Sequence, residues 1–157
     1  GVEKEIVTAI WGLESAYGSF RGGDSVLSSL TTLAYDARRA EFFEGELLDA
    51  LRILQAGDTD AEQLRGSWAG AMGMTQFIPA TFRDYAVDFN GDGNKDLWGT
   101  EADALDSAAH YLSRFGWRGE EPIYAETRLP SRFDFSQSDG RKKTIAELRQ
   151  VFQKNLF

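Results

Sequence analysis

The chain has 157 residues, of which 42% are hydrophobic and 27% charged, and its formal net charge is -8. This composition predicts one soluble folded domain, the negative charge argues against a nucleic-acid partner, and no apolar run approaches the roughly 20 residues that span a bilayer. The absence of cysteine excludes disulfides, thiolate metal sites and a cysteine nucleophile, and the only histidine, His110, is not accompanied by a serine in a nucleophile-elbow setting.

The first predicted helix, residues 3–17, carries the acid on which the functional interpretation depends, Glu14. Residues three, four and seven positions apart share a helix face, so Glu14 lies among apolar neighbours. These neighbours are Val7, Ile10 and Trp11. We expect them to desolvate the carboxylate and to favour its protonated form, which suits a proton donor. The alternative is a structural role, in which Glu14 is buried and paired with an arginine.

Helical periodicity also predicts which residues of this first helix face the core. They are Ile6, Ala9, Ile10, Leu13 and Tyr17. We expect the helix to end at Gly18, because glycine tolerates the left-handed backbone that follows a last turn. Glu14 would then occupy the final turn, where a side chain can face a cleft.

Two further helices follow a glycine-containing loop. Asp24 or Ser25 is expected to cap the second helix, and Asp36 interrupts its pattern. The third helix is predicted over residues 38–56 and ends at Gly57. Its apolar residues are Phe42, Phe43, Leu47, Leu51 and Leu54.

The most unusual passage is residues 66–73, which read Gly-Ser-Trp-Ala-Gly-Ala-Met-Gly. Three glycines among small residues indicate close backbone approach or unusual dihedral angles. Such a loop could hold a sugar or a peptide against main-chain groups, with Gln76 just beyond it for hydrogen bonding. The alternative is a tight connection between packed helices. Pro79 is expected at the start of the next helix.

Residues 88–96 read Asp-Phe-Asn-Gly-Asp-Gly-Asn-Lys-Asp and match the beginning of a calcium loop. In such a loop, oxygen atoms at alternating positions converge on a hard cation, and Gly93 makes the sharp turn. Gly99 stands at loop position 12, where a bidentate glutamate is expected, so Glu101 or Asp103 would have to reach back. We expect a structural ion at this loop; the alternative is a solvated turn rich in Asp and Asn.

The remaining part begins with a helix predicted over residues 102–115, on which Tyr111 could simply pack as an amphipathic residue. Residues 122–135 indicate one or two short extended pieces. Thr144 and Glu147 have the spacing of a capping box, which predicts a final helix. The fold class expected is therefore mainly α, with a small β-containing part.

Four motifs, taken in order and spacing, resemble the membrane-bound lytic murein transglycosylase B family over roughly residues 2–117. The motifs are Gly12-Leu-Glu-Ser-Ala-Tyr-Gly18, Arg38-Arg-Ala-Glu-Phe-Phe43, Gly66-Ser-Trp-Ala-Gly-Ala-Met-Gly73 with Gln76-Phe-Ile-Pro79, and Asp88-Phe-Asn-Gly-Asp-Gly93 followed by Leu97-Trp98. The resemblance implies a lysozyme-like helical fold with an EF-hand-like loop and a groove for peptidoglycan glycan strands. It implies one lysozyme-like domain over residues 1–157, with a helical core at 1–117, the calcium loop at 88–103, and extended segments and a final helix at 118–157.

In that family the glutamate of the first motif, here Glu14, is the only catalytic acid and base. The resemblance implies that it protonates the β-1,4 bond between N-acetylmuramic acid and N-acetylglucosamine and that a 1,6-anhydromuramoyl end forms. An acetamido oxygen of the substrate is thought to stabilise the positive centre, which explains why no second acid with a comparable setting is found. Ordinary glycosidases need two carboxylates.

Motif positions also imply substrate-binding and metal-binding residues. The residues that would line the groove are Ser67, Gln76, Tyr111 and Tyr35. The residues that would bind calcium are Asp88, Asn90, Asp92, Asn94 through its carbonyl, and Asp103. No organic cofactor is expected.

The resemblance places the protein in the periplasm or cell envelope, with peptidoglycan as its partner, and the printed sequence contains no signal segment. We expect a monomer. The residues also allow two other classes of function. One is a peptidoglycan-binding module without turnover, and the other is a calcium-stabilised helical interaction domain in which Glu14 only takes part in a buried ion pair.

Overall fold

The computed structural model describes residues 1–119, 121, 133–137, 140–141, 143–144 and 146–147. The chain divides into two compact units, Gly1–Glu120 and Glu121–Phe157. The described elements are α1 (Lys4–Ser15), β1 (Asp24–Ser25), α2 (Val26–Tyr35), α3 (Ala40–Ala56), β2 (Arg65–Gly66), α4 (Pro79–Tyr85), α5 (Glu101–Arg114) and a short 3-10 helix (Phe135–Gln137). Within these described ranges the protein is mainly helical, as its sequence predicts.

The β structure lies elsewhere than the sequence predicts. β1 and β2 form a two-stranded antiparallel sheet in which Asp24 pairs with Gly66 and Ser25 with Arg65. The predicted extended segment at 122–135 falls mostly outside the described residues, and its last residue begins the 3-10 helix. The sheet therefore joins the start of α2 to the start of the glycine-rich loop of residues 66–73.

Several helix ends follow local chemistry. The Ser25 hydroxyl accepts a hydrogen bond from the backbone N–H of Ser28 at 3.4 Å and so caps α2. Gly57 ends α3 with a left-handed backbone at φ 85°, and Pro79 opens α4. Thr144 and Glu147 exchange hydrogen bonds in both directions, which confirms the predicted capping box.

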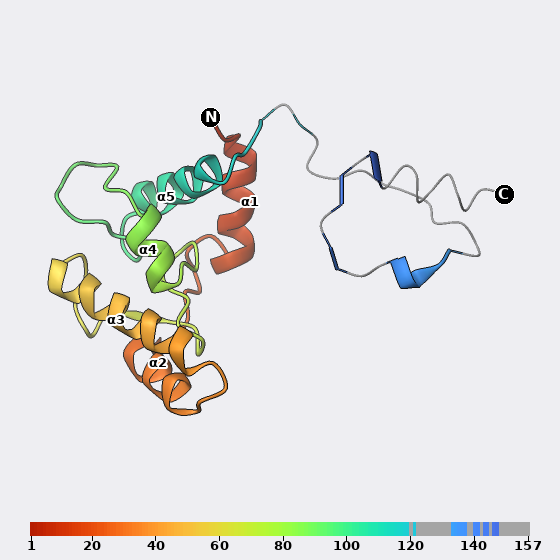
Figure 1. Cartoon of the computed structure of the whole chain (residues 1–157). Coiled ribbons are helices and arrows are strands. Elements are labelled where there is room, and N and C mark those ends of the chain that lie inside the picture. The colour runs from red at the N-terminus through yellow and green to blue at the C-terminus, as the bar shows by residue number, and fades with distance from the viewer. Residues whose placement is uncertain (120, 122–132, 138–139, 142, 145, 148–157) are drawn as a thin grey trace. The chain divides into compact units, whose positions relative to one another are not determined.

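The helices of the first unit pack in a spatial order that differs from their order in the chain (Figure 1). α1 packs against α5, α5 against α4, α4 against α3, and α3 against α2. The core is formed mainly by α2 to α5 and the segments between them. Its buried hydrophobic residues are Val26, Leu30, Ala50, Ile53, Leu64, Met72, Met74, Phe77, Phe82, Ala86, Leu97, Trp98 and Ala104.

α1 differs from its prediction in two ways. Its predicted core stripe is wrong in part, because Leu13 is 87% exposed and Ala9 and Tyr17 are exposed as well, whereas Val7 is buried. The physical reason is that α1 makes its main helix contact with α5 alone, so only one narrow stripe is covered. The helix also ends earlier than Gly18, because Ala16 already has a left-handed backbone.

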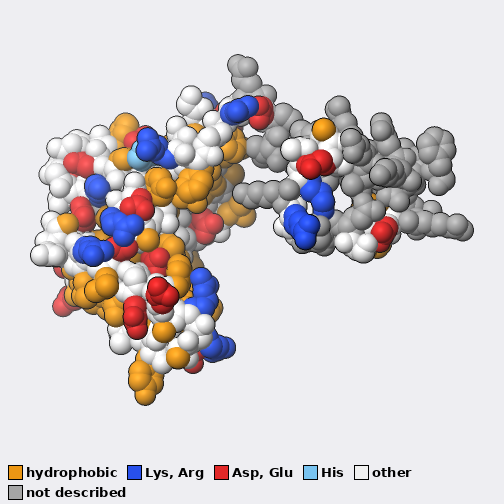
Figure 2. Space-filling model, viewed as in Figure 1, with side chains coloured by type: hydrophobic (Ala, Val, Ile, Leu, Met, Phe, Trp, Pro, Cys, Tyr) orange, Lys and Arg blue, Asp and Glu red, His pale blue; other side chains and the backbone are white. Residues whose placement is uncertain are grey.

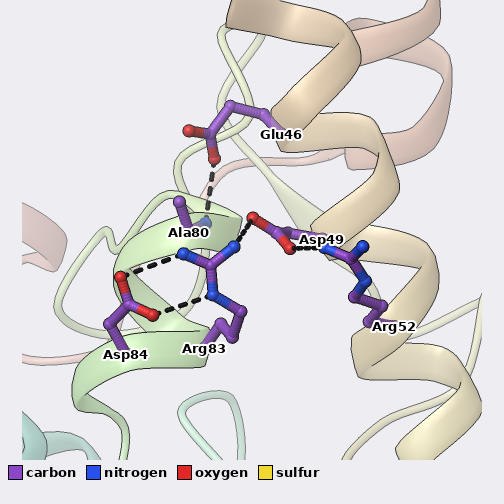
Figure 3. A network of polar contacts seen from close by, with 6 residues as sticks. All are labelled: Glu46, Asp49, Arg52, Ala80, Arg83 and Asp84. Carbon is purple, nitrogen blue, oxygen red and sulfur yellow. Dashed lines mark hydrogen bonds and ion pairs between the residues drawn. The ribbon is translucent and has the colours of Figure 1, made fainter.

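A polar network built on the buried acids of α3 joins α3 to α4 (Figure 3). Asp49 on α3 accepts hydrogen bonds from Arg83 on α4 and from Arg52 one turn further along α3. Arg83 also pairs with Asp84, and this guanidinium lowers the pKa of the Asp84 carboxyl. Figure 2 shows acidic and basic side chains intermixed on this face of the molecule, with exposed hydrophobic side chains between them. Three of the exposed hydrophobic residues, Phe42, Leu48 and Leu51, belong to α3.

Among the described residues, every helix is too short or too polar to cross a bilayer.

Candidate functional site

One cavity brings together three of the residues that the sequence singled out. Glu14 at the end of α1, Gln76 in the segment before α4, and Tyr111 on α5 all line a cavity of about 310 Å³. This volume is near the lower end of the range of ligand pockets. The other lining residues are Ile10, Thr75, Phe77, Ile78, Thr81, Ala108 and Leu112. Residues distant in sequence therefore meet around a single acid.

Glu14 is exposed at the edge of this cavity rather than buried on an apolar face. The expectation that its neighbours on α1 desolvate it is wrong, for the same reason that the predicted core stripe is wrong: α1 is covered on one side only. The alternative of a buried acid paired with an arginine is wrong as well. Among the described residues, no ion pair includes Glu14. Its carboxylate is thus accessible to a ligand from the cavity.

The end of α1 is held by its own motif residues, which positions Glu14 in the last turn. The Ser15 hydroxyl donates to the Trp11 carbonyl at 3.2 Å and accepts from the Gly18 N–H at 2.9 Å. Gly12 leaves room for the Tyr17 ring, because a Cβ at position 12 would lie 2.8 Å from that ring. The sequence reasoning missed Ser15, although a serine four residues after Trp11 on a helix is a common partner for its carbonyl.

Gln76 lines the cavity and also holds its wall together through hydrogen bonds of its side chain. Its backbone is left-handed at φ 51°, which is unusual for a residue with a side chain. Its amide nitrogen donates to the carbonyls of Gly73 at 2.9 Å and Arg21 at 3.2 Å. Since carbonyls only accept hydrogen bonds, these partners fix which way the amide is turned. Gln76 therefore ties two loops together at the wall of the cavity.

Tyr111 belongs to an aromatic cluster between α4 and α5. Its ring lies 4.6 Å from that of Phe115, 5.2 Å from Tyr85 and 5.7 Å from Phe77, measured between centroids. Edge-to-face and tilted contacts of this kind orient the rings. Phe115 is exposed, so the cluster continues from the cavity wall to the surface of the protein. Tyr111 therefore both packs against its neighbours on α4 and α5 and lines the cavity, so the two predictions made for it are compatible.

The structure does not bring Ser67 or Tyr35 to this cavity. The Ser67 hydroxyl accepts hydrogen bonds from the N–H groups of Ala69 and Ala71, so it holds the loop of residues 66–73 in shape. Tyr35 is the last residue of α2 and is 91% exposed. Neither residue is among those that line the cavity with Glu14.

Thr75 is a lining residue that the sequence reasoning missed. Only 5% of its surface is exposed, and in the described part of the chain its hydroxyl has no hydrogen-bond partner. A buried hydroxyl without a partner costs about 1–3 kcal/mol. No signal in the sequence marks this threonine, because its burial depends on segments far away in the chain.

In the predicted calcium loop, the carboxylates accept hydrogen bonds from backbone N–H groups of the loop itself. Asp88 accepts hydrogen bonds from the N–H groups of Gly91 and Gly93, and Asp92 accepts one from Asn94, which lowers the pKa of Asp92. The fully buried Asp103 accepts from the N–H groups of two other residues of the loop region. Those residues are Phe89 and Asp96.

The predicted ligands of this loop are therefore not arranged as a metal site. Across the described residues, no three acidic or histidine side chains are placed to hold a metal ion. The physical reason is that the carboxylates are turned onto backbone N–H groups. The donor types nevertheless suit calcium, since oxygen atoms stand at alternating positions from Asp88 to Asp92.

Comparisons with known proteins cover most of the chain. The family model described as "Transglycosylase SLT domain" matches residues 1–155. Membrane-bound lytic murein transglycosylase B of Escherichia coli (strain K12) is 43% identical over 118 residues, which make up 74% of this chain and 32% of that protein. The chain thus spans about a third of the length of this curated relative.

Solved structures show the same fold. SltB3 from Pseudomonas aeruginosa in complex with NAG-NAM-pentapeptide has a TM-score of 0.83 and 51% identity, covering 96% of this chain and 40% of that chain. SltB3 is also known in complex with NAG-anhNAM-pentapeptide. The Escherichia coli lytic transglycosylase Slt35 in complex with calcium has a TM-score of 0.77 and 34% identity, covering 96% of this chain and 48% of that chain.

Proposed function

The chain belongs to the transglycosylase SLT domain family, and from this we propose that it is a lytic transglycosylase of peptidoglycan acting through Glu14. The observation that carries the proposal is the placement of Glu14, in the last turn of α1, in one cavity with Gln76 and Tyr111. The complexes of SltB3 with NAG-NAM-pentapeptide and NAG-anhNAM-pentapeptide support the choice of substrate and product.

The proposed reaction needs one group that gives and then takes a proton. Protonated Glu14 donates to the oxygen of the β-1,4 bond between N-acetylmuramic acid and N-acetylglucosamine as that bond breaks. The resulting carboxylate then accepts the proton of the muramoyl 6-hydroxyl as its oxygen attacks the anomeric carbon. A 1,6-anhydro ring closes, and Glu14 returns to its protonated form.

This chemistry agrees with the composition of the cavity. Hydrolysis by ordinary glycosidases uses two carboxylates that flank the bond. Glu14 is the only acidic residue among those lining the cavity. The acetamido oxygen of the substrate stabilises the positive centre in place of a carboxylate nucleophile, and attack by the 6-hydroxyl removes the need for a base that activates water. We assign Gln76 and Tyr111 to sugar binding, Ser67 to support of the neighbouring loop, and leave Tyr35 as a prediction.

Digestion of purified peptidoglycan tests the proposal. The wild-type protein should release muropeptides with 1,6-anhydro ends, detected by mass spectrometry. Glu14→Gln should lower their yield by at least about 100-fold, because general acid-base catalysis contributes about 10²–10⁴-fold. The matched control is Glu5→Gln, which removes an exposed acid from the same helix and should leave the yield unchanged.

The same experiment separates the alternative functions. Binding to peptidoglycan with no anhydro product would favour a binding module without turnover. Neither binding nor product would favour a helical interaction domain. Products with hydrolysed reducing ends in place of anhydro ends would contradict the proposed ring closure. They would still agree with Glu14 as the proton donor to the glycosidic oxygen.

We also propose that the loop at residues 88–103 binds calcium as a structural ion. The support is its run of oxygen-bearing side chains and the calcium complex of the relative Slt35. Each carboxylate has about four acceptor positions, so Asp88 and Asp92 can bind the ion while they keep their loop N–H partners. Asp103 is better placed to hold the two ends of the loop together than to bind the ion.

The proposed place of action is the cell envelope, where peptidoglycan lies. The support is the similarity to the membrane-bound transglycosylase of Escherichia coli. We propose that glycan strands are the partner and that the protein acts as a monomer.

A further inference from the structure

We propose that the protein has a second glycan-binding site, separate from the Glu14 cavity, in which Trp68 and the hydroxyl groups at the start of α2 bind a neutral sugar unit. The identity of the polysaccharide rests on the proposed function. The site itself shares no residue with the Glu14 cavity, so it can be tested without turnover.

Trp68 presents an uncovered indole ring on the loop of residues 66–73. Of its surface, 71% is exposed. Within the described residues, its indole N–H has no hydrogen-bond partner and its ring contacts no other aromatic ring. Tryptophan offers a large apolar face together with one donor, and a ligand that covers this face removes it from water. An indole exposed in this way at a cavity is therefore suited to contact a ligand.

The loop that carries Trp68 is held in shape before any ligand binds. The Ser67 hydroxyl accepts a hydrogen bond from the Ala71 N–H at 3.1 Å, and the Gly70 N–H donates to the Ser67 carbonyl at 3.0 Å. Gly70 also packs directly on α2, since a Cβ at this position would lie 2.6 Å from the side chain of Leu30. A ligand of Trp68 therefore does not have to order this loop, which is a usual entropic cost of binding.

Serine and threonine residues at the start of α2 line the same cavity, whose volume is about 370 Å³. They lie three, four and seven positions apart and so share one face of the helix. These residues are Ser25, Ser28, Ser29 and Thr32. The hydroxyls of Ser28 and Ser29 have no partner among the described residues. Because a hydroxyl group both donates and accepts, this face can pair with several polar groups of a ligand.

An aromatic face beside a row of hydroxyl groups is suited to a sugar. One face of a pyranose ring with equatorial substituents consists of C–H groups, which can pack on an indole, and its edge carries groups that donate and accept hydrogen bonds. Asp24 is the only charged residue among those that line the cavity. Its carboxylate can accept from a sugar hydroxyl and would repel an anionic group. The cavity therefore favours a neutral sugar unit over a carboxylate or a phosphate.

A contact of this kind would strengthen attachment to a polymer without acting on the bond that is cleaved. Peptidoglycan presents many sugar units, and two linked binding events raise the affinity beyond that of either one alone. Loss of the second site should therefore raise the KM for polymeric substrate with little change in kcat.

Binding to purified peptidoglycan sacculi tests the site, measured by co-sedimentation in a Glu14→Gln background that prevents turnover. Trp68→Ala should weaken binding about tenfold, whereas Trp68→Phe keeps an aromatic ring and should retain most of the affinity. The matched control is Phe89→Ala, which removes another exposed ring from a different cavity, lined by residues of α1 and α5. It should bind as the parent does.

Replacement of serines tests the polar wall. The double variant Ser28→Ala with Ser29→Ala removes the two unpaired hydroxyl groups and should weaken binding. Its melting temperature should stay the same or rise, because alanine is the better helix former, so a loss of binding would not reflect unfolding. Thr31→Ala removes a hydroxyl from the same helix outside the cavity and should leave binding unchanged.

NMR spectra of the Glu14→Gln protein locate the ligand. A tetrasaccharide of β-1,4-linked N-acetylglucosamine should shift the indole N–H signal of Trp68, which Trp68→Phe identifies by its disappearance. An unmoved Trp68 signal at saturating tetrasaccharide, or full binding of Trp68→Ala to sacculi, would overturn the inference. It would also be overturned if Trp68→Ala abolished self-association in sedimentation velocity without affecting glycan binding, since the cavity would then take a second copy of this chain.

The outcomes also separate this inference from the proposed function. If binding to sacculi depends on Trp68 but no anhydro ends form with Glu14 intact, the second site stands and the proposed turnover fails. If anhydro ends form and neither binding nor KM responds to Trp68→Ala, the turnover stands and the second site fails.

Discussion

The carboxylate of Glu46 on α3 accepts a hydrogen bond from the backbone N–H of Ala80, 2.9 Å away in the first turn of α4 (Figure 3). The first N–H groups of a helix have no partner within it, and Pro79 has none to offer. Glu46 therefore caps α4 from another helix while only 5% of its own surface is exposed. This contact anchors α4 directly after residues 75–78, which line the Glu14 cavity.

Replacement of Glu46 by glutamine should flatten the pH dependence of stability. Burial is the main reason that the pKa of Glu46 is raised above its ordinary value of 4.5, although the Ala80 N–H lowers it. The folded state then binds more protons than the unfolded state at pH values from about 4.5 upward, so this group's contribution to stability falls as pH rises through that window. Glu46→Gln keeps an oxygen acceptor for Ala80 but does not titrate.

Urea unfolding at several pH values measures this difference. Relative to wild type, Glu46→Gln should gain stability as pH rises from about 4.5 to 7. Glu44→Gln, which removes an exposed acid from the same helix, should follow the wild-type curve. Parallel curves for wild type and Glu46→Gln would show that burial of Glu46 has no effect on its proton affinity.

Asp49 should contribute measurably to stability through its two arginine partners. Only 3% of the surface of Asp49 is exposed, and its carboxylate lies 2.5 Å from the guanidinium of Arg83 and 2.6 Å from that of Arg52. Asp49→Ala leaves both guanidinium groups without this partner, but both are partly exposed and water can solvate them. We therefore expect a loss of about 1–3 kcal/mol in the free energy of unfolding, rather than the larger cost of an isolated buried charge.

The control for this prediction uses the same arginine. Asp84 also pairs with Arg83, but on the exposed side. Asp84→Ala should cost less than Asp49→Ala in chemical denaturation, and its effect should shrink in high salt, because exposed ion pairs are screened. Equal losses would indicate that burial of Asp49 adds nothing to the pair.

The helix ends that could be predicted are those set by a single residue's own chemistry. Ser25 caps with its hydroxyl, Gly57 adopts a left-handed backbone, and Pro79 fits a first turn. The buried face of α3 could not be found in this way, since it includes Glu46 and Asp49. Glu46 pairs with Ala80 and Asp49 with Arg83, both on α4, and hydrophobic periodicity carries no information about a partner more than 30 residues away.

The same distinction applies to the site. Three site residues could be predicted from the similarity of the sequence motifs to those of the family: Glu14, Gln76 and Tyr111. All three line one cavity. The exposure of Glu14 was not predicted, because a helical wheel shows which residues share a face but not whether another element covers that face. Thr75 was missed for a related reason: its burial follows from the packing of distant segments.

Gly66 should tolerate no side chain, in contrast to a glycine in α3. A Cβ on Gly66 would overlap the carbonyl oxygen of Ala71, which accepts a hydrogen bond from the Ser67 N–H at 2.8 Å. Gly66→Ala should therefore lower stability by about 1–3 kcal/mol, as overpacking does. Gly45→Ala, with nothing within 4 Å of the added Cβ, should raise it by about 0.5–1 kcal/mol. Thermal and urea unfolding measure both, and equal effects would contradict the close approach at Gly66.

Calcium should stabilise the protein through the loop at residues 88–103. An ion that binds only the folded state adds about 2.7 kcal/mol at 100 times its dissociation constant, which corresponds to a rise in Tm of roughly 5–11 °C for a chain of this size. Chelator should remove the gain, and Asp92→Ala should abolish it, since Asp92 is one of the proposed ligands. Asp24→Asn, a change of charge on β1 outside the loop, should keep the full gain. A Tm that is the same with calcium and with chelator would mean that the loop depends only on hydrogen bonds from its carboxylates to its own amides.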